Sequence, residues 1–276
     1  MTMESEREFN FTQKDFKFIR DLVAEQTGIA LSEAKSHMVY SRLSRRLRSL
    51  NIATFAQYCD CLNDATSDEL VHFVNALTTN LTAFFRENHH FEFLANTLLP
   101  NLFATKTNKR IRIWSAGCST GEEPYSLAMV LRENLPKTGA WDVKILATDL
   151  DSNVVAKASS GIYEENRLNG LTSRRMKRFF IKNRYTNQVK VKPEVRELIT
   201  FKQLNLMHDW PMKGPFDFIF CRNVVIYFNK DTQKTLFKRF ADLTADKGYL
   251  FIGHSESLFQ VSTQYQLIGN TIYQRY

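Results

Sequence analysis

The sequence predicts an α/β domain built on a parallel sheet, preceded by a smaller domain made only of helices. Gly28 is the only glycine before Gly117, and Pro100 is the first proline, so the first hundred residues lack the residues that strands and tight turns require. From Arg110 onward, short apolar or β-rich segments alternate with helical stretches. That alternation is typical of a parallel sheet with helices on both faces.

The first part of the chain, residues 1–75, is expected to be helical because its apolar residues recur at helical spacing. Its segment SHMVYSRLSRRLRSL carries one apolar stripe, formed by Val39, Leu43, Leu47 and Leu50.

The other side of this predicted helix is basic. Arg42, Arg45 and Arg48 fall away from the apolar stripe at about 100° per residue. Residues 35–48 contain five basic residues and no acidic one. A solvated helix face is the ordinary interpretation of such a pattern. A docking face for an acidic helix or a phosphate backbone is the alternative.

Five segments of the second part predict the strands of the sheet. They are RIRIWSAG, VKILATDL, LITFKQLNL, FDFIFCRNVVIYF and GYLFIGHS. The last segment, YQLIGNTIYQRY, predicts one strand that closes antiparallel beside its predecessor. Residues 166–196 interrupt the alternation with ten basic residues and one acidic residue, Glu194, and predict a small inserted subdomain.

Composition excludes several classes of protein. Four cysteines in 276 residues are too few for a disulfide framework, and their spacing predicts no metal site. No apolar run approaches the roughly 18 residues of a membrane span, and the charged N-terminus lacks the apolar core of a signal peptide. We expect a soluble cytoplasmic protein, and the net charge of +8 favours an anionic partner.

The segment AGCSTGEEPYS follows the first predicted strand and fits the G-x-S-x-G turn of hydrolases. Ser119, Asp217 and His254 occur in the chain order Ser, Asp, His that α/β-hydrolases use. The context argues against this interpretation. The hydrolase turn normally follows several strands, whereas only helical sequence precedes Arg110, and no oxyanion-loop motif lies upstream.

The same segment also fits the glycine turn of a nucleotide-binding fold. Glu122 and Glu123 stabilise a helix start, but they occupy the place of a pyrophosphate and would repel it. S-adenosylmethionine, which carries a sulfonium and an ammonium but no phosphate, removes the conflict. Asp149, 28 residues after Gly121 at the end of the second predicted strand, suits the ribose hydroxyls, although such a residue often caps the next helix. Methyl transfer is therefore the preferred chemistry.

Four ordered motifs, TNLTAFFRENHHF, WSAGCSTGEEPYS, CRNVVIYF and GYLFIGHSESL, resemble the chemotaxis receptor methyltransferases of the CheR family over nearly the whole chain. The resemblance implies a Rossmann-like methyltransferase domain at 93–276 with an inserted antiparallel β subdomain at about 160–200. It implies an all-α, receptor-docking domain at 1–75 and an interdomain segment at 76–92 that contributes to the cofactor site. The implied activity is methyl transfer from S-adenosylmethionine to glutamate side chains of the receptors' cytoplasmic helical bundle, in sensory adaptation, with S-adenosylhomocysteine as product.

The resemblance also implies the site residues. Cofactor contacts are implied for Asn80, Thr82, Arg86, Gly117, Glu123, Asp149, Asn205, Leu206, Arg222 and Asn223. Arg86 and Tyr227 resemble the residues nearest the transferred methyl group, and Arg42, Arg45 and Arg48 resemble a docking face for acidic receptor helices. Without the resemblance, the sequence favours a packing role for Tyr227, on an apolar strand, and an ion-pair role for Arg222. No general base is expected, because a glutamate carboxylate is already ionised at neutral pH.

One segment departs from the family pattern. FFIKNRYTNQVKVKP is shorter than the glycine-rich loop with which some members grip a peptide tether at the receptor's C-terminus, and it contains no glycine. We therefore expect a tether-independent enzyme. We also expect a monomer that associates with membrane receptor arrays without inserting into the membrane. Two alternatives stay open. One is a nucleic-acid methyltransferase with the basic 166–196 segment as its footprint, and the other is a protein that binds the cofactor for sensing or docking, without turnover.

Overall fold

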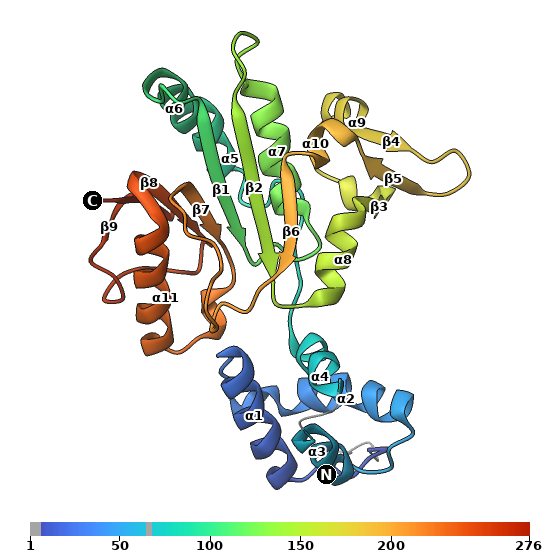
Figure 1. The fold of residues 1–276 in the computed structure, drawn as a ribbon. Helices are drawn as coiled ribbons and strands as arrows, with labels where there is room; N and C mark the ends of the chain where they lie inside the picture. Colours follow the sequence, from blue (N-terminus) through green and yellow to red (C-terminus); the bar gives the residue numbers. More distant parts are fainter. Residues whose placement is uncertain (1–6, 65–67) are drawn as a thin grey trace. The chain divides into compact units, whose positions relative to one another are not determined.

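The computed structural model describes residues 7–64 and 68–276, so the charged N-terminal stretch 1–6 and residues 65–67 lie outside the described residues. The chain divides into two compact units (Figure 1). The first comprises Met1–Thr79 with Tyr227–Asn229, and the second comprises Asn80–Ile226 with Lys230–Tyr276. None of the helices in the described ranges is long and apolar enough to cross a bilayer.

The first unit is helical, as predicted. Its helices are α1 (Gln13–Thr27), η1 (Glu33–Lys35), α2 (Ser36–Leu50), α3 (Phe55–Asn63) and α4 (Glu69–Leu77). α1 begins with a capping box between Thr12 and Asp15, and ends where Gly28 adopts a φ of 75°. The predicted apolar stripe of α2 is buried at Val39, Leu43 and Leu47, whereas Leu50, in the last turn, is 39% exposed. Leu50 therefore does not belong to the core.

The second unit is an α/β fold around a seven-stranded sheet, which confirms the predicted fold class. Its elements are α5 (His89–Phe93), η2 (Leu94–Leu98), α6 (Leu99–Thr105), β1 (Arg110–Ala116), α7 (Glu122–Asn134), β2 (Asp142–Asp149), α8 (Ser152–Ser160), β3 (Ile162–Glu164), η3 (Glu165–Leu168), α9 (Ser173–Phe179), β4 (Phe180–Lys182), β5 (Gln188–Val191), α10 (Pro193–Arg196), β6 (Ile199–Gln203), β7 (Phe216–Cys221), η4 (Val225–Tyr227), α11 (Lys230–Leu243), β8 (Thr244–Ile252), β9 (Tyr265–Gly269) and β10 (Ile272–Arg275).

The strand order of the sheet is β6-β2-β1-β7-β8-β10-β9, and the first five strands are parallel. The chain passes from β1 to β2 and β6 on one side, and later to β7 and β8 on the other (Figure 1). The order therefore reverses between β1 and β7. In open parallel sheets, the carboxyl ends of the strands beside such a reversal form the ligand site.

The inserted subdomain is a three-stranded antiparallel sheet in the order β3-β5-β4. Its buried side chains, among them Tyr163, Phe180 and Val189, belong to the same apolar cluster as Ile113 of β1 and Phe220 of β7. Because these residues share one core, the insertion is packed into the second unit rather than being an appendage to it.

The end of the chain differs from the prediction of a single closing strand. Two strands form there, and β10 pairs antiparallel with β8 while β9 lies at the outer edge. Asn270 and Thr271 join them with φ values of 45° and 60°. Two successive residues at positive φ make the tight turn that suits a hairpin, and such a turn usually has glycine at its second position. Thr271 occupies that position here, so the sequence does not indicate the turn.

Candidate cofactor site

The glycine turn predicted to bind the cofactor directly follows the carboxyl end of β1, and β1 lies beside the reversal in strand order. Its start is fixed to the neighbouring strand, because the N–H groups of Gly117 and Cys118 both donate to the carbonyl of Thr148 at 2.8 Å. Gly117 has a φ of 90°, and a Cβ there would lie 2.3 Å from Cγ2 of Val224. Glycine is thus required at this position by the backbone conformation and by the close approach of the loop after β7.

Ser119, which suggested a hydrolase nucleophile, serves the shape of this turn. Its backbone N–H donates to Oδ2 of Asp149 at 2.7 Å, and its hydroxyl donates to the carbonyl of Asn80 at 3.0 Å. Its φ of 49° is also imposed by the turn.

The other two residues of the suspected triad have different partners. Asp217 pairs with Nζ of Lys106 at 2.5 Å and accepts the N–H of Arg112, while Nδ1 of His254 lies 2.9 Å from Oε1 of Glu87. Within the described residues, no hydrogen bond joins Ser119, Asp217 and His254, so the hydrolase interpretation is wrong.

Ser119→Ala is therefore expected to reduce methyl transfer by less than about tenfold, since one hydrogen bond contributes roughly 0.5–1.5 kcal/mol. Initial rates with labelled cofactor measure this. Complete loss of activity with unchanged cofactor affinity would restore a chemical role for the hydroxyl.

Asp149 ends β2 and holds two backbone groups at once. Oδ2 accepts the N–H of Ser119, and Oδ1 accepts the N–H of Asp151 at 3.0 Å. Burial raises the pKa of its carboxyl group. The capping role that could have explained Asp149 belongs to Asp151 instead, whose side chain accepts the N–H of Asn153 at the start of α8. The carboxylate of Asp149 therefore belongs to the turn rather than to a helix cap.

The two glutamates that open α7 point to different partners, although both are buried. Oε1 of Glu122 is paired with Nη2 of Arg167 from η3 at 2.5 Å, and Oε2 accepts the hydroxyl of Thr120 at 2.6 Å. Arg167 also donates to the carbonyl of Thr82 at 3.0 Å. Glu122 thus links the inserted subdomain to the cofactor turn, a role that its position beside Glu123 does not reveal.

Glu123 lies toward β7. Its Oε1 accepts the hydroxyl of Ser115 at 2.7 Å, and its Oε2 lies 3.3 Å from Nη1 of Arg222. Burial raises the pKa of Glu123, while Arg222 and Ser115 act in the opposite direction.

Arg222 follows β7 and lies between two carboxylates, with its side chain only 2% exposed. Nη2 is 3.3 Å from Oε2 of Glu87 and donates to the carbonyl of Arg86 at 2.5 Å. Burial opposes ionisation of Glu87, but the hydrogen bond from His254 and the charge of Arg222 outweigh it and lower the pKa of Glu87 to about 2. Sequence reasoning missed Glu87, which lies 135 residues from Arg222 in the chain.

The segment that precedes α5 brings three more predicted residues to this region. Asn80 donates from its side-chain amide to Oδ2 of Asp151 at 2.7 Å. The carbonyl of Thr82 accepts Arg167, and the guanidinium of Arg86 donates to the carbonyl of Leu81 at 2.8 Å. Asn80 is joined to the Asp149 side of the site through Asp151, and Arg86 to the Arg222 side through its own carbonyl, which accepts Nη2 of Arg222.

The remaining predicted residues lie on the loops after β6 and β7. The N–H of Leu204 donates to the carbonyl of Asp149 at 2.9 Å, which places Asn205 and the buried Leu206 just beyond the end of β2. Asn223 has a φ of 58° and donates its N–H to Glu256 at 3.0 Å. Tyr227 ends η4 but, unlike Val225 and Ile226, groups with the first unit, where its carbonyl accepts the N–H of Ala30 at 2.8 Å.

One cluster has the composition of a metal site. Single ligand atoms of Glu87, His89 and His90 lie within 4.8 Å of one another. The guanidinium of Arg222 already supplies a positive charge to Glu87. Burial, with the charge of Arg222, lowers the pKa of His90 to about 3. A second cation at this cluster would be repelled by the first, so we assign no metal to it.

The chemistry of the strand ends suits a cationic, phosphate-free ligand. Glu87 and Glu123 supply two carboxylates around one buried cation, Arg222, and Asp149 supplies a third at the end of β2, where it accepts the N–H groups of Ser119 and Asp151. The glycine turn allows close approach of a ligand, and Glu123 stands in the first turn of α7, where a phosphate would otherwise bind. A Rossmann-like sheet with this acidic site defines a methyltransferase that uses S-adenosylmethionine.

Comparison with known families identifies the particular kind. The all-alpha domain of CheR methyltransferases matches residues 14–78, and the SAM binding domain of CheR methyltransferases matches residues 80–274. The chain belongs to the CheR methyltransferase family, and its cofactor is S-adenosylmethionine.

Curated relatives match over most of their length. The chain is 44% identical to chemotaxis protein methyltransferase 2 of Pseudomonas aeruginosa over 97% of this chain and 95% of the relative. It is 43% identical to the chemotaxis protein methyltransferase of Escherichia coli, over 94% and 89%. A solved structure of a putative sarcosine dimethylglycine methyltransferase from Galdieria sulphuraria aligns with a TM-score of 0.36 at 14% identity, over 60% of this chain and 46% of that one.

The basic side of α2 in the first unit is less free than the sequence suggests. Arg42 donates to the carbonyls of Leu77 at 2.9 Å and Thr78 at 2.6 Å, at the end of α4. Arg48 pairs with Glu8 at 2.5 Å, and both side chains are about half exposed. Arg45 is exposed, and no hydrogen bond or ion pair links its side chain to another described residue.

Proposed function

We propose that this protein transfers the methyl group of S-adenosylmethionine to glutamate side chains of chemotaxis receptors, forming methyl esters in sensory adaptation. The observation that carries the proposal is similarity to named chemotaxis protein methyltransferases over about nine tenths of both chains. The histidines near the site support it, because their partners are protein groups: His90 is hydrogen-bonded to the carbonyl of Asn270, and His254 to the carboxylate of Glu87. An ionised carboxylate acceptor needs no histidine as a base.

The residues of the second unit have distinct parts in this proposal. Bound S-adenosylmethionine supplies an electrophilic methyl group on a sulfonium. Asp149 is proposed to hold the ribose hydroxyls, and Glu123 the positively charged end of the cofactor. Arg86, half-buried and tied to the carbonyl of Leu81, is proposed to orient the acceptor carboxylate through its remaining donors. The family resemblance, rather than a contact in the structure, proposes Tyr227 as the second residue near the methyl group.

The test of this function is methyl transfer from labelled S-adenosylmethionine to receptor cytoplasmic fragments. We expect labelled ester that mild alkali releases as methanol, and no labelling when the receptor glutamates are replaced by alanine. Labelling of RNA but not of receptor fragments would favour a nucleic-acid methyltransferase. Cofactor binding without transfer to any acceptor would favour a sensing or docking protein.

The basic side of α2 is proposed to dock acidic receptor helices, and Arg45 is its most available residue. Arg45→Glu is expected to raise KM for the receptor fragment by about three- to tenfold with little change in kcat, and to weaken the salt dependence of KM. Lys17→Glu, the same charge change at an exposed position of α1, is the matched control. Equal effects of the two variants would show a general charge effect instead of a docking site.

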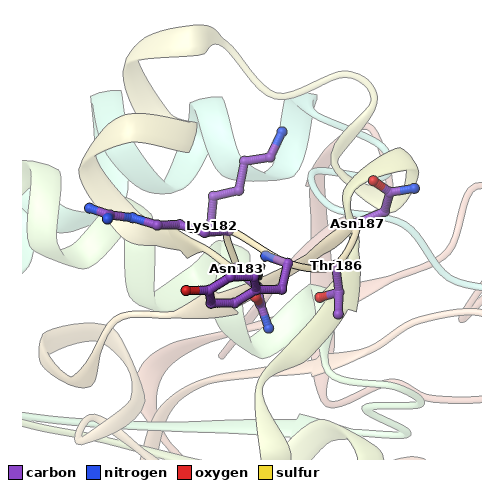
Figure 2. Close-up of a pocket in the computed structure, with 6 residues that line it drawn as sticks. Lys182, Asn183, Thr186 and Asn187 are labelled. Carbon is purple, nitrogen blue, oxygen red and sulfur yellow. Dashed lines mark hydrogen bonds between the residues drawn. The ribbon is translucent and has the colours of Figure 1, made fainter.

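We also propose that the enzyme acts without a receptor tether, as a monomer in the cytoplasm at receptor arrays. The turn between β4 and β5 is closed by its own contacts, because the N–H of Asn183 donates to the carbonyl of Gln188 at 2.8 Å and Oδ1 of Asn183 accepts the N–H of Tyr185 at 2.9 Å. Figure 2 shows the residues that line a pocket at this turn, residues 182–187, and none of them is a glycine. This turn therefore differs from the glycine-rich loop with which some family members grip a receptor tether.

Tether independence predicts equal initial rates on receptor fragments with and without their C-terminal tails. It also predicts no measurable binding of the isolated tail peptide in calorimetry. A tail peptide that binds, or a tail that accelerates methylation, would contradict this part of the proposal.

A further inference from the structure

The carboxylate of Glu256, in the loop after β8, accepts a concentrated set of backbone hydrogen bonds. Oε2 accepts the N–H groups of Gly253 at 2.5 Å and Asn223 at 3.0 Å. Oε1 accepts three more, from Val224 at 2.9 Å, Val225 at 3.0 Å and Ile226 at 3.3 Å. Glu256 is 6% exposed, so these bonds are shielded from water.

Four of the five donors lie in the segment between β7 and α11, directly after Arg222. This segment turns at Asn223, whose φ is 58°, and begins η4 at Val225. The first N–H groups of a helix have no partner within it, and a nearby side chain usually satisfies one of them. Here one carboxylate from another loop satisfies the first two N–H groups of η4, those of Val225 and Ile226, together with those of the two residues before it.

The two loops can meet because their strands are parallel neighbours and because residue 253 is a glycine. Cys221 at the end of β7 is opposite Ile252 at the end of β8. A Cβ on Gly253 would lie 2.4 Å from Nδ2 of Asn223. Gly253 therefore allows the loop of Glu256 to lie directly on the segment that carries the predicted cofactor residues.

We propose that Glu256 is a positioning residue for methyl transfer, which fixes Arg222 and Asn223 in the cofactor site and sets the start of η4. Glu256 acts through the backbone of residues 223–226. This inference rests on the proposed roles of Arg222 and Asn223, and it adds a residue that the resemblance did not single out.

Glu256→Gln tests the proposal, because it keeps the shape of the side chain but turns an amide NH2 toward at least two backbone N–H groups. We expect the Kd for S-adenosylmethionine to rise at least about tenfold and kcat to fall at least about tenfold, at a temperature where circular dichroism shows an intact fold. Glu256→Asp keeps the carboxylate and is expected to recover part of both.

Asp217→Asn is the matched control at the opposite end of β7. Asp217 is also a buried carboxylate, which accepts the N–H of Arg112 at 2.8 Å and pairs with Lys106. This variant is expected to lower Tm without changing Kd or kcat. Gly253→Ala is a second variant that displaces Asn223 and leaves the Glu256 side chain chemically unchanged, and it is expected to raise Kd as Glu256→Gln does.

The outcomes separate the inference from the proposed function. If Glu256→Gln and Gly253→Ala keep Kd and kcat within about twofold of Asp217→Asn, Glu256 contributes only to stability and the inference is wrong. Cofactor Kd is measured by calorimetry without any acceptor. A wild-type enzyme that fails to methylate receptor glutamates would therefore overturn the proposed function and leave the comparison of Kd values intact.

Discussion

Asp149→Ala is expected to weaken the binding of S-adenosylmethionine by at least 100-fold while the protein remains folded. A hydrogen bond to a charged group contributes about 1.5–3 kcal/mol, so the loss of two ribose contacts corresponds to about 3–6 kcal/mol. The same substitution releases the N–H groups of Ser119 and Asp151, which Asp149 holds at 2.7 and 3.0 Å. The turn that receives the cofactor would lose its anchor together with the direct contacts.

Isothermal titration calorimetry with S-adenosylmethionine and S-adenosylhomocysteine measures this loss. Asp142→Ala removes a carboxylate from the opposite end of the same strand, where Asp142 pairs with Arg112, and is expected to leave cofactor affinity unchanged. An Asp149→Ala protein that binds the cofactor within about fivefold of the wild type would show that Asp149 does not contact it.

Much of the fold could be predicted because its signals are local. The strands that became β1 and β2 are short runs of apolar and β-branched residues, and the turn after β1 is marked by Gly117 and Gly121. Parallel strands bring their carboxyl ends to one edge of a sheet, which places the turn after β1 beside Asp149 at the end of β2. The hydrogen bond between Ser119 and Asp149 joins the two.

The partners of the site residues could not be predicted, because they come from distant segments without a local signal. Glu87 reaches Arg222, and Arg167 reaches Glu122. The motif GHSESL singled out the stretch that contains Glu256, but nothing in its letters shows that one carboxylate would accept five backbone N–H groups.

Helical periodicity has a similar limit. It correctly predicted which side of α2 is buried, but the use of the opposite side depends on neighbours in three dimensions. Arg42 reaches the carbonyls of Leu77 and Thr78 at the end of α4, which lie 35 and 36 positions further along the chain. A basic stripe therefore gives the direction of side chains and leaves open which of them are available to a partner.

Arg222→Met is expected to lower the free energy of unfolding by about 3–5 kcal/mol, because it leaves Glu87 and Glu123 buried without their shared cation. The Arg222 side chain is buried, and methionine fills much of the same volume, so the loss of stability from an empty cavity is small. Glu87→Gln in the Arg222→Met background removes one of the two uncompensated charges and is expected to recover part of the loss. The tryptophans, Trp114, Trp141 and Trp210, all lie in the second unit, so their fluorescence during urea unfolding reports on the unit that contains this pair.

The pH dependence of that loss separates electrostatics from packing. In the wild type, the pKa of Glu87 is lowered from 4.5 to about 2, so its ionisation stabilises the fold above pH 4.5, and this contribution is lost as the pH falls toward 2. Without Arg222 the carboxyl group loses a charge that favours its ionised form, and the pKa of Glu87 moves upward. The variant's deficit is therefore expected to be largest near neutral pH and to shrink as the pH falls below 4.5, because protonation removes the uncompensated charge. A deficit that stays equal at pH 7 and pH 4 would mean that Arg222 stabilises the unit by packing, and that the carboxylates around it tolerate burial without a cation.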